Sequence, residues 1–291
     1  MRAAGSARAK AGTETDLKVF IFDLDRCNGC HNCQIACKDE HVDNDWSPIA
    51  RPQPDTGQFW CKVDEEVCGK TPHVRVNYLP RLCNHCDDAP CMKAFPQAVY
   101  KRPDGLVIID PEKAQGVEGL AESCPYGAIY WNKELGLAQK CTGCAHLLDD
   151  GWEEPRCVDA CCTGALRFGE EGDFAEELSC AEVLSPEWGT APRVYYLHKP
   201  KRFIAATVVD KEADEVVEGA TVTLQRAEDG ATVATAATDE FGDVWLEGLE
   251  PGRYRMWVQK EGYLDLPYAF DLTEKDQAVP EMRFYRKPAT A

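Results

Sequence analysis

Four cysteines within eleven residues constrain this chain more than any other feature of its sequence. They follow the spacing Cys27-x2-Cys30-x2-Cys33-x3-Cys37. In runs of this spacing, three thiolates hold one cubane iron–sulfur cluster and the fourth ligates a different cluster. The run therefore predicts further cysteine-rich stretches that complete both clusters. A zinc knuckle or a disulfide knot is the alternative, but zinc sites usually join two separate C-x2-C pairs.

Three later stretches follow the same frame to different degrees. The second has Cys83, Cys86 and Cys91, with Phe95 at the place of a fourth cysteine. The fourth stretch supplies a complete set, which is Cys141, Cys144, Cys157 and Cys161. In the third stretch only the last of the four positions is a cysteine; the positions are Ala114, Val117, Leu120 and Cys124.

The ligands can be paired because the first three cysteines of one run share a cluster with the last cysteine of its partner run. This rule predicts three [4Fe–4S] clusters, with about twelve iron atoms per chain. The three sets are Cys27, Cys30, Cys33 and Cys161; Cys37, Cys141, Cys144 and Cys157; and Cys83, Cys86, Cys91 and Cys124. A fourth cluster would need residues 95, 114, 117 and 120, which are all apolar. We expect these four side chains to fill its place with packed atoms.

The distribution of the sixteen cysteines supports metal binding over a disulfide scaffold. Fifteen of them lie before residue 163, in clustered short spacings, within a chain of 291 residues. Four have no place in the ligand pattern and are expected to be free thiols; they are Cys61, Cys68, Cys162 and Cys180.

Histidines and basic residues also lie beside the cluster cysteines. Because the cysteine sets are complete, we interpret His31, His85 and His146 as loop residues or as neighbours of ligands. Lys140 and Arg156 precede Cys141 and Cys157, and they either offset cluster charge or are ordinary surface charges.

The composition changes near residue 201. Residues 1–16 predict a disordered tail and residues 17–200 a polyferredoxin-like domain, whereas residues 201–291 read as short strands separated by turns. Turn-and-strand segments recur at 95–100, 124–130 and 161–167, which suggests two pseudo-symmetric halves. The expected fold class is α+β: two pseudo-symmetric ferredoxin-like units followed by an all-β sandwich or barrel. Residues 38–72 are expected to be an irregular insertion.

Charge and hydropathy limit the partners. The net charge of −18 disfavours nucleic acid and anionic membrane surfaces. No apolar run approaches the roughly 20 residues that span a bilayer, so no direct membrane insertion is expected. The first residues lack the apolar segment of a signal peptide and a twin-arginine pair, which predicts a cytoplasmic protein. Export with a signal-bearing partner remains an alternative.

The four-run arrangement, with CPYG at 124–127 and KCTGCAHLLDDG at 140–151, resembles the iron–sulfur subunits of the dimethyl sulfoxide reductase family of molybdopterin enzymes. The missing fourth site, together with DPEKAQG at 110–116 and APRVYY at 191–196, is similar to the small subunits of pyrogallol–phloroglucinol transhydroxylases. The C-terminal part resembles carboxypeptidase-regulatory-like sandwiches. Residues 1–16 are an extension outside this resemblance.

The resemblance implies a large partner subunit that carries a molybdopterin cofactor with molybdenum or tungsten and performs the catalysis. No catalytic residue is expected on this chain. The cluster of Cys27 would lie nearest that cofactor, that of Cys37 in the middle and that of Cys83 outermost. The missing site corresponds to the membrane-side end of longer relatives, so a soluble enzyme, with a soluble electron donor as a possible further partner, is implied.

Several functions stay open at this point. The first is an electron-transfer subunit of a transhydroxylase acting on polyhydroxylated aromatics without net redox change. The second is the same subunit in a reductive dehydroxylase of catechol-type substrates or another molybdopterin reductase, for which turnover would need a stoichiometric reductant. A free-standing polyferredoxin carrier and a metal-bearing structural or adhesion protein are the alternatives from other classes. For the β domain, docking or stability is favoured over carbohydrate binding.

Overall fold

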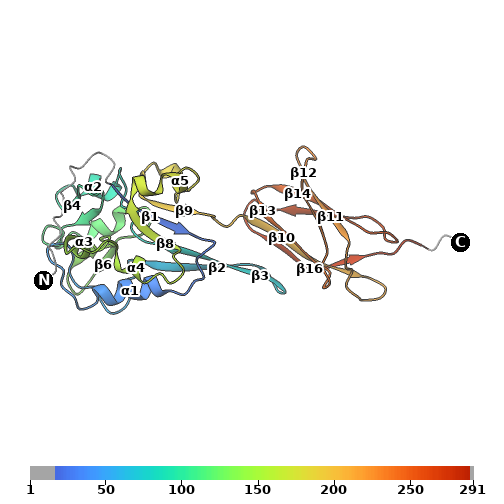
Figure 1. Ribbon diagram of the computed structural model, residues 1–291, viewed down its shortest axis with the longest axis horizontal. Helices are drawn as coiled ribbons and strands as arrows, with labels where there is room; N and C mark the ends of the chain where they lie inside the picture. Colours follow the sequence, from blue (N-terminus) through green and yellow to red (C-terminus); the bar gives the residue numbers. More distant parts are fainter. Residues whose placement is uncertain (1–16, 289–291) are drawn as a thin grey trace, which may run out of the picture. The chain divides into compact units, whose positions relative to one another are not determined.

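The computed structural model describes residues 17–288, which form two compact units (Figure 1). Within the described chain, the first unit contains residues up to Asp64 together with Tyr78–Lys199. The second contains Glu65–Asn77 and the chain from Pro200 onward. The predicted tail at 1–16 lies outside the described residues.

A three-stranded sheet, ordered β8-β1-β9, forms the centre of the first unit. Strand β1 (Lys18–Asp23) pairs antiparallel with β8 (Leu166–Glu170) and parallel with β9 (Val194–Leu197). The apolar run of β1 is buried on both faces of the sheet. One face of the sheet packs, in the main core of the unit, against cysteines that the sequence predicts to be cluster ligands. The sheet therefore positions the candidate metal centre.

Short elements surround this sheet. Two small antiparallel hairpins pair β4 (Val99–Lys101) with β5 (Val107–Ile109), and β6 (Tyr130–Asn132) with β7 (Leu137–Gln139). The helices are α1 (Asn32–His41), α2 (Pro90–Ala94), α3 (Ala145–Asp149), α4 (Arg156–Asp159) and α5 (Ala175–Leu178). Short 3-10 helices are η1 (Glu118–Ser123), η2 (Glu171–Phe174) and η3 (Pro186–Trp188). Of these five α-helices, α1 alone exceeds five residues.

The expected irregular insertion at 38–72 contains a regular strand, and this expectation was wrong in part. Strand β2 (Lys62–Lys70) pairs with β3 (His73–Arg81) as a hairpin. The pattern KVDEEVCGK is too polar to signal a strand by itself. Its outer part, residues 65–77, belongs to the second unit, where the ring of His73 lies 3.3 Å from the hydroxyl of Thr207.

The second unit is a two-sheet β structure. One sheet is ordered β13-β10-β16, from β13 (Asp243–Leu249), β10 (Arg202–Asp210) and β16 (Gln277–Phe284). The other is ordered β12-β11-β14-β15, from β12 (Thr232–Ala237), β11 (Thr221–Arg226), β14 (Arg253–Gln259) and β15 (Leu266–Asp271). Side chains of both sheets share one hydrophobic core. On β14, Tyr254, Met256 and Val258 are buried in that core, as their alternation predicts.

Most of the regular secondary structure of the described chain is β-strand, and its helices are short. The expected α+β class therefore holds only in part. The strands of the second unit form two separate sheets, so the sandwich alternative holds and the barrel alternative was wrong. The two pseudo-symmetric ferredoxin-like halves stay a prediction. Over residues 17–288, no helix has the length and apolar character that crossing a membrane requires.

Asp210, at the end of β10, ties together three parts of the second unit. Its carboxylate accepts hydrogen bonds from the hydroxyl of Tyr263 at 2.7 Å and from the guanidinium of Arg286 at 2.5 Å, and its side chain is 2% exposed. The Tyr263 hydroxyl first, with backbone N–H groups and Arg286, holds the pKa of Asp210 well below its ordinary value. A lowered carboxyl pKa stabilises the folded state above the unfolded pKa of about 3.9, and this stabilisation is lost as the pH falls through the folded pKa.

We therefore expect Asp210→Asn to lower the hydrogen-exchange protection of β10 and β16 at pH 7. The difference in protection from the wild-type chain should narrow below about pH 4, where the carboxyl group of Asp210 begins to protonate in the unfolded state, and should vanish as the pH falls through the lower pKa of the folded state. Mass spectrometry of deuterium uptake in the intact chain, corrected for intrinsic exchange at each pH, measures it. Asp214→Asn is the control, because Asp214 is 78% exposed and lies 3.7 Å from Arg283. Equal protection of the Asp210 variant and wild type at pH 7 would contradict the expectation.

Candidate metal centre

Three C-x-x-C loops in the first unit share one backbone geometry. Their third positions are Gly29, His85 and Gly143, with φ of 67°, 45° and 64°. Each third residue directs its backbone N–H toward the sulfur of the first cysteine: Gly29 to Cys27, His85 to Cys83 at 3.5 Å and Gly143 to Cys141 at 3.3 Å. Glycine suits this left-handed conformation. A Cβ at Gly29 would also lie 2.2 Å from the ring of Tyr78.

The first predicted ligand set converges around the start of α1. Burial raises the pKa of Cys27, and the nearby thiols of Cys33, Cys161 and Cys30 raise it further. The run 27–33 comes from the loop before α1 and its first turn, whereas Cys161 follows α4. Helices α1 and α4 pack together and so unite parts of the chain that are far apart in sequence. Cys30 is exposed, which leaves this set nearest the surface.

The second set is fully buried. Its members are Cys37 on α1, Cys141 and Cys144 before α3, and Cys157 on α4. Burial raises the pKa of Cys37 well above its ordinary value, with further contributions from the thiols of Cys157, Cys141 and Cys144. The last cysteine of the first run therefore lies beside cysteines of the fourth run, which is the arrangement that the pairing rule predicts.

The third set lies in a separate apolar cluster with α2 and η1. Burial raises the pKa of Cys86 to about 12, and the thiols of Cys83, Cys124 and Cys91 contribute to this rise. Cys91 lies on α2, and Cys124 follows η1. After burial and the thiol of Cys157, the thiol of Cys83 also raises the pKa of Cys141, so the second and third sets are neighbours.

The four apolar residues of the absent fourth set lie together. Ala114 and Leu120 are fully buried, and Val117 and Phe95 pack against the same cluster. Helix α2 and η1 meet at this point. Packed hydrocarbon thus occupies the region where the sequence frame would place a fourth cluster.

The donor groups around the thiols suit an anionic iron–sulfur cluster. Four buried thiols cannot all ionise together without positive charge, which iron would supply. Backbone N–H groups already point at the sulfurs, including that of Leu166 to Cys161 at 3.3 Å. Lys140 is buried and donates to the carbonyl oxygen of Cys141 at 2.9 Å. Burial raises the pKa of Cys91 to about 11, and the charge of Lys140 opposes this rise. Arg156 instead pairs with Asp159.

The described residues 17–288 contain no group of three or more His, Cys, Asp or Glu side chains spaced for a single metal ion. Ligands of one tetrahedral ion converge on a single point. A four-iron cubane instead offers a separate iron atom to each of its four thiolates.

Cys61 has a more specific place than a buried free thiol. It is fully buried in the main core, and its sulfur lies between those of Cys157 and Cys33, with which it forms side-chain hydrogen bonds. The bond from Cys61 lowers the pKa of Cys33 to about 7. Cys61 therefore connects the first and second sets. Because Cys61 is far from every cysteine run in the sequence, no local pattern indicated this position.

The other three cysteines outside the ligand sets, and His146, have different surroundings. The sulfur of Cys162 lies 3.9 Å from that of Cys30, and Cys180 is exposed and donates to the carbonyl oxygen of Glu177. Cys68 lies in the second unit, where it accepts from Asn77. His146 lies 3.1 Å from Glu40.

Two histidine rings lie beside ligand sulfurs of the second set. His85 Nε2 is 3.8 Å from Cys141 Sγ, and His41 Nε2 is 3.8 Å from Cys144 Sγ. The role expected for His85, a neighbour of ligands, matches this position, whereas His41 was missed. His41 lies four residues after Cys37, one helical turn further along α1, which was the available signal.

Comparison with known proteins agrees with this reading of the two units. The family model of the 4Fe-4S dicluster domain matches residues 74–171, and that of the carboxypeptidase regulatory-like domain matches residues 204–283. The pyrogallol hydroxytransferase small subunit of Pelobacter acidigallici is 39% identical over 253 residues, covering 84% of this chain and 90% of that protein.

Other relatives match a smaller share of this chain. One of the subunits of tetrathionate reductase from Salmonella typhimurium is 34% identical over 64% of this chain and 74% of its own. The arsenate respiratory reductase iron-sulfur subunit of Shewanella sp. is 31% identical over 61% of this chain and 94% of its own. The chain therefore belongs, as a non-catalytic electron-transfer subunit, to the iron–sulfur subunits of the dimethyl sulfoxide reductase family of molybdopterin enzymes, in the branch of the pyrogallol hydroxytransferase small subunit.

Proposed function

We propose that this chain holds three [4Fe–4S] clusters in a row and exchanges electrons with a large molybdopterin-carrying partner that acts on polyhydroxylated aromatics. The ligands are the three cysteine sets named above: Cys27, Cys30, Cys33 and Cys161; Cys37, Cys141, Cys144 and Cys157; Cys83, Cys86, Cys91 and Cys124. The clusters, when bound, supply one-electron transfer. The protein's own part is to hold the thiolates, direct N–H groups at them and exclude water.

The observation that carries this proposal is the order of the sets. Cys61 lies against members of the first and second sets, and Cys83 of the third set is close enough to act on Cys141 of the second. The second set is thus central and buried, while the first approaches the surface at Cys30. An exposed first cluster suits transfer to a partner subunit. The apolar fourth region supports three clusters over four.

The substrate class rests on the relative named as a pyrogallol hydroxytransferase small subunit. That reaction class moves a hydroxyl group between aromatic rings, and the clusters would then poise the metal centre without net electron flow. A reductase of catechol-type substrates is the second candidate, because other relatives are named as subunits of reductases. A cytoplasmic location and the two pseudo-symmetric ferredoxin-like halves belong to the same proposal.

Anaerobic purification of the tagged chain from its native cells tests the proposal. We expect a large molybdenum- or tungsten-containing subunit to co-purify, and about twelve iron atoms per copy of this chain. The complex should convert a trihydroxybenzene without added reductant. A need for stoichiometric reductant would favour the dehydroxylase alternative. Purification without a large partner would favour a free polyferredoxin, and about eight or sixteen iron atoms would refute the cluster count.

A further inference from the structure

His85 touches two of the proposed clusters' ligand sets at once. Its backbone N–H lies 3.5 Å from the sulfur of Cys83, in the third set. Its ring Nε2 lies 3.8 Å from the sulfur of Cys141, in the second set. The ring is completely buried and stacks on Phe20, with 5.9 Å between ring centroids and 17° between planes. The covalent bonds within His85 therefore connect the N–H group that faces the third set to the ring nitrogen that faces the second set.

The protein fixes which ring nitrogen carries the proton. The backbone N–H of Val107, at the start of β5, donates to His85 Nδ1 at 3.0 Å. A nitrogen that accepts a hydrogen bond has no proton of its own, so the proton of the neutral ring is on Nε2. The Nε2–H group is the one that faces Cys141. The ring thus presents a hydrogen-bond donor, and not an acceptor, to this sulfur.

The backbone of His85 indicates that its side chain is retained at a cost. It occupies the left-handed position that Gly29 and Gly143 fill in the two equivalent loops, at a φ of 45°. A residue with a Cβ is strained in this left-handed conformation relative to ordinary helical geometry. Glycine would satisfy the loop geometry without strain and would remove the ring. Of the three loops, that of Cys83 is therefore the one that places a ring at this position.

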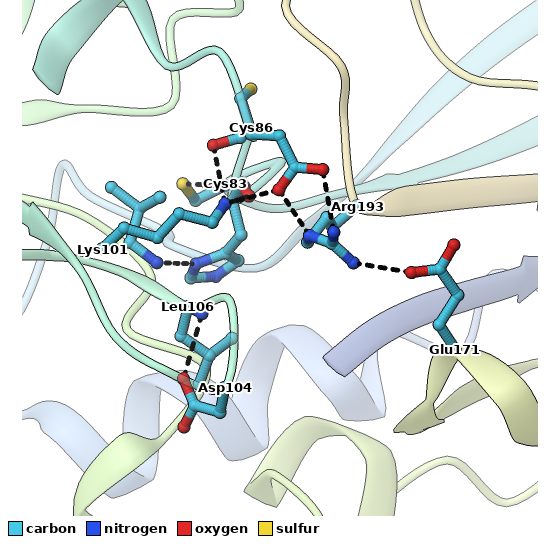
Figure 2. A network of polar contacts seen from close by, with 10 residues as sticks. Cys83, Cys86, Lys101, Asp104, Leu106, Glu171 and Arg193 are labelled. Carbon is cyan, nitrogen blue, oxygen red and sulfur yellow. Dashed lines mark hydrogen bonds and ion pairs between the residues drawn. The ribbon is translucent and has the colours of Figure 1, made fainter. Parts of the chain in front are cut away.

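Charged side chains hold the loop of Cys83 and Cys86 (Figure 2), and this loop also carries His85. The Lys101 ammonium donates to the carbonyl oxygens of His85 at 3.2 Å and of Cys86 at 3.0 Å. It also pairs with Asp87 at 2.7 Å, and Arg193 binds the same carboxylate and Glu171. These bonds fix the loop, and with it the direction of the ring.

We propose that His85 is a positioning residue that donates a hydrogen bond from Nε2 to the Cys141 thiolate and thereby raises the reduction potential of the central cluster. This inference rests on the proposed assignment of the clusters. A reduced cluster carries one more negative charge than an oxidised one, so a donor to its thiolate stabilises the reduced state more. His85 belongs to the loop of the outer cluster, so its atoms and its hydrogen bonds to Cys83 and Cys141 also form a continuous path between the outer and central clusters.

The test compares His85→Leu and His85→Gln in the complete anaerobic complex by redox titration monitored with EPR. Both variants carry the same backbone strain, but glutamine keeps an N–H donor and leucine does not. We expect the leucine variant to shift only the central cluster to lower potential. At a fixed applied potential its reduced-to-oxidised ratio should fall about tenfold, which corresponds to about 59 mV for one electron. The glutamine variant should recover most of this shift.

His146→Leu is the matched control, because His146 also follows a cluster cysteine but its ring bonds Glu40 and stacks on Trp46. It should leave the potentials of all three clusters close to those of wild type. If wild type lacks three [4Fe–4S] signals, the cluster assignment fails. If wild type has all three signals, the inference about His85 is overturned when His85→Leu shifts none of them, or when the glutamine and leucine variants shift equally.

A second measurement decides the question should the leucine variant fail to assemble. Wild-type complex labelled with ¹⁵N-histidine should show a weak nitrogen coupling to the reduced central cluster in pulsed EPR. The coupling should persist in His41→Gln, which removes the other ring beside this set. Its absence from wild type, or its complete loss in His41→Gln, would overturn the inference.

Discussion

Replacing Cys124 with serine is expected to remove the outer cluster and leave the other two, so that iron falls from about twelve to about eight atoms per chain. Cys124 follows η1 and lies with Cys83, Cys86 and Cys91; burial raises its pKa, and the thiol of Cys83 raises it further. EPR and iron analysis of the anaerobic complex measure the outcome. The outer cluster is at the end of the proposed row, so the signals of the other two should keep their potentials.

Cys180→Ser is the control for this prediction. Cys180 is exposed and belongs to none of the ligand sets, and its thiol donates to the carbonyl oxygen of Glu177. The control should retain about twelve iron atoms. Conversion of the outer cluster to a three-iron form in Cys124→Ser would still agree with the ligand set. Loss of the central or first signal in its place would show that the pairing of runs is wrong.

Shortening Leu120 to alanine is expected to destabilise the first unit by about 2–5 kcal/mol. Leu120 is completely buried in the apolar cluster that occupies the fourth region, with Ala114, Val117 and Phe95. Removing the isopropyl end of its side chain opens a cavity between η1 and α2, next to the loop of Cys124 and the helix of Cys91. Urea unfolding followed by the visible absorbance of the clusters, under anaerobic conditions, gives the change in stability.

Glu122→Ala, on the same 3-10 turn, is the matched control. The side chain of Glu122 lies outside the apolar cluster, and changes of this kind at a surface alter stability by about 0.5 kcal/mol or less. A Leu120 variant that unfolds at the same urea concentration as wild type would mean that the fourth region is loosely filled. The proposal that packed side chains replace a cluster would then lose its physical basis.

The cysteine spacings predict a candidate site because cubane ligation is encoded in short local intervals. The partner of each run comes from a distant part of the chain, yet the pairing rule placed Cys37 with Cys141 and Cys157, and the structure brings these thiols together. The alternating pattern of β14 likewise predicted its buried face. These features follow from periodicity and spacing, which are properties of sequence.

Other features had no local signal. Strand β2 is too polar to be recognised without its partner β3, and β15 and β16 lack the regular alternation of buried and exposed residues that marks β14. Nothing near Cys61 in sequence indicates that it would lie between Cys33 and Cys157. The sequence left open whether Lys140 offsets cluster charge or is an ordinary surface charge, and the structure shows that it is buried and donates to the carbonyl oxygen of Cys141.

The sequence by itself determined the cysteine spacings from which the shared clusters are predicted, and the family that the chain resembles, because ligand spacing is local and can be read without knowledge of packing. The tertiary structure alone decided what surrounds those thiols: the proton position on His85, the buried ammonium of Lys140 and the thiol of Cys61 between two sets. These depend on strands and loops that are distant in sequence and meet only when the core packs. Reduction potential is set by such neighbours, so it is the property that spacing cannot reveal.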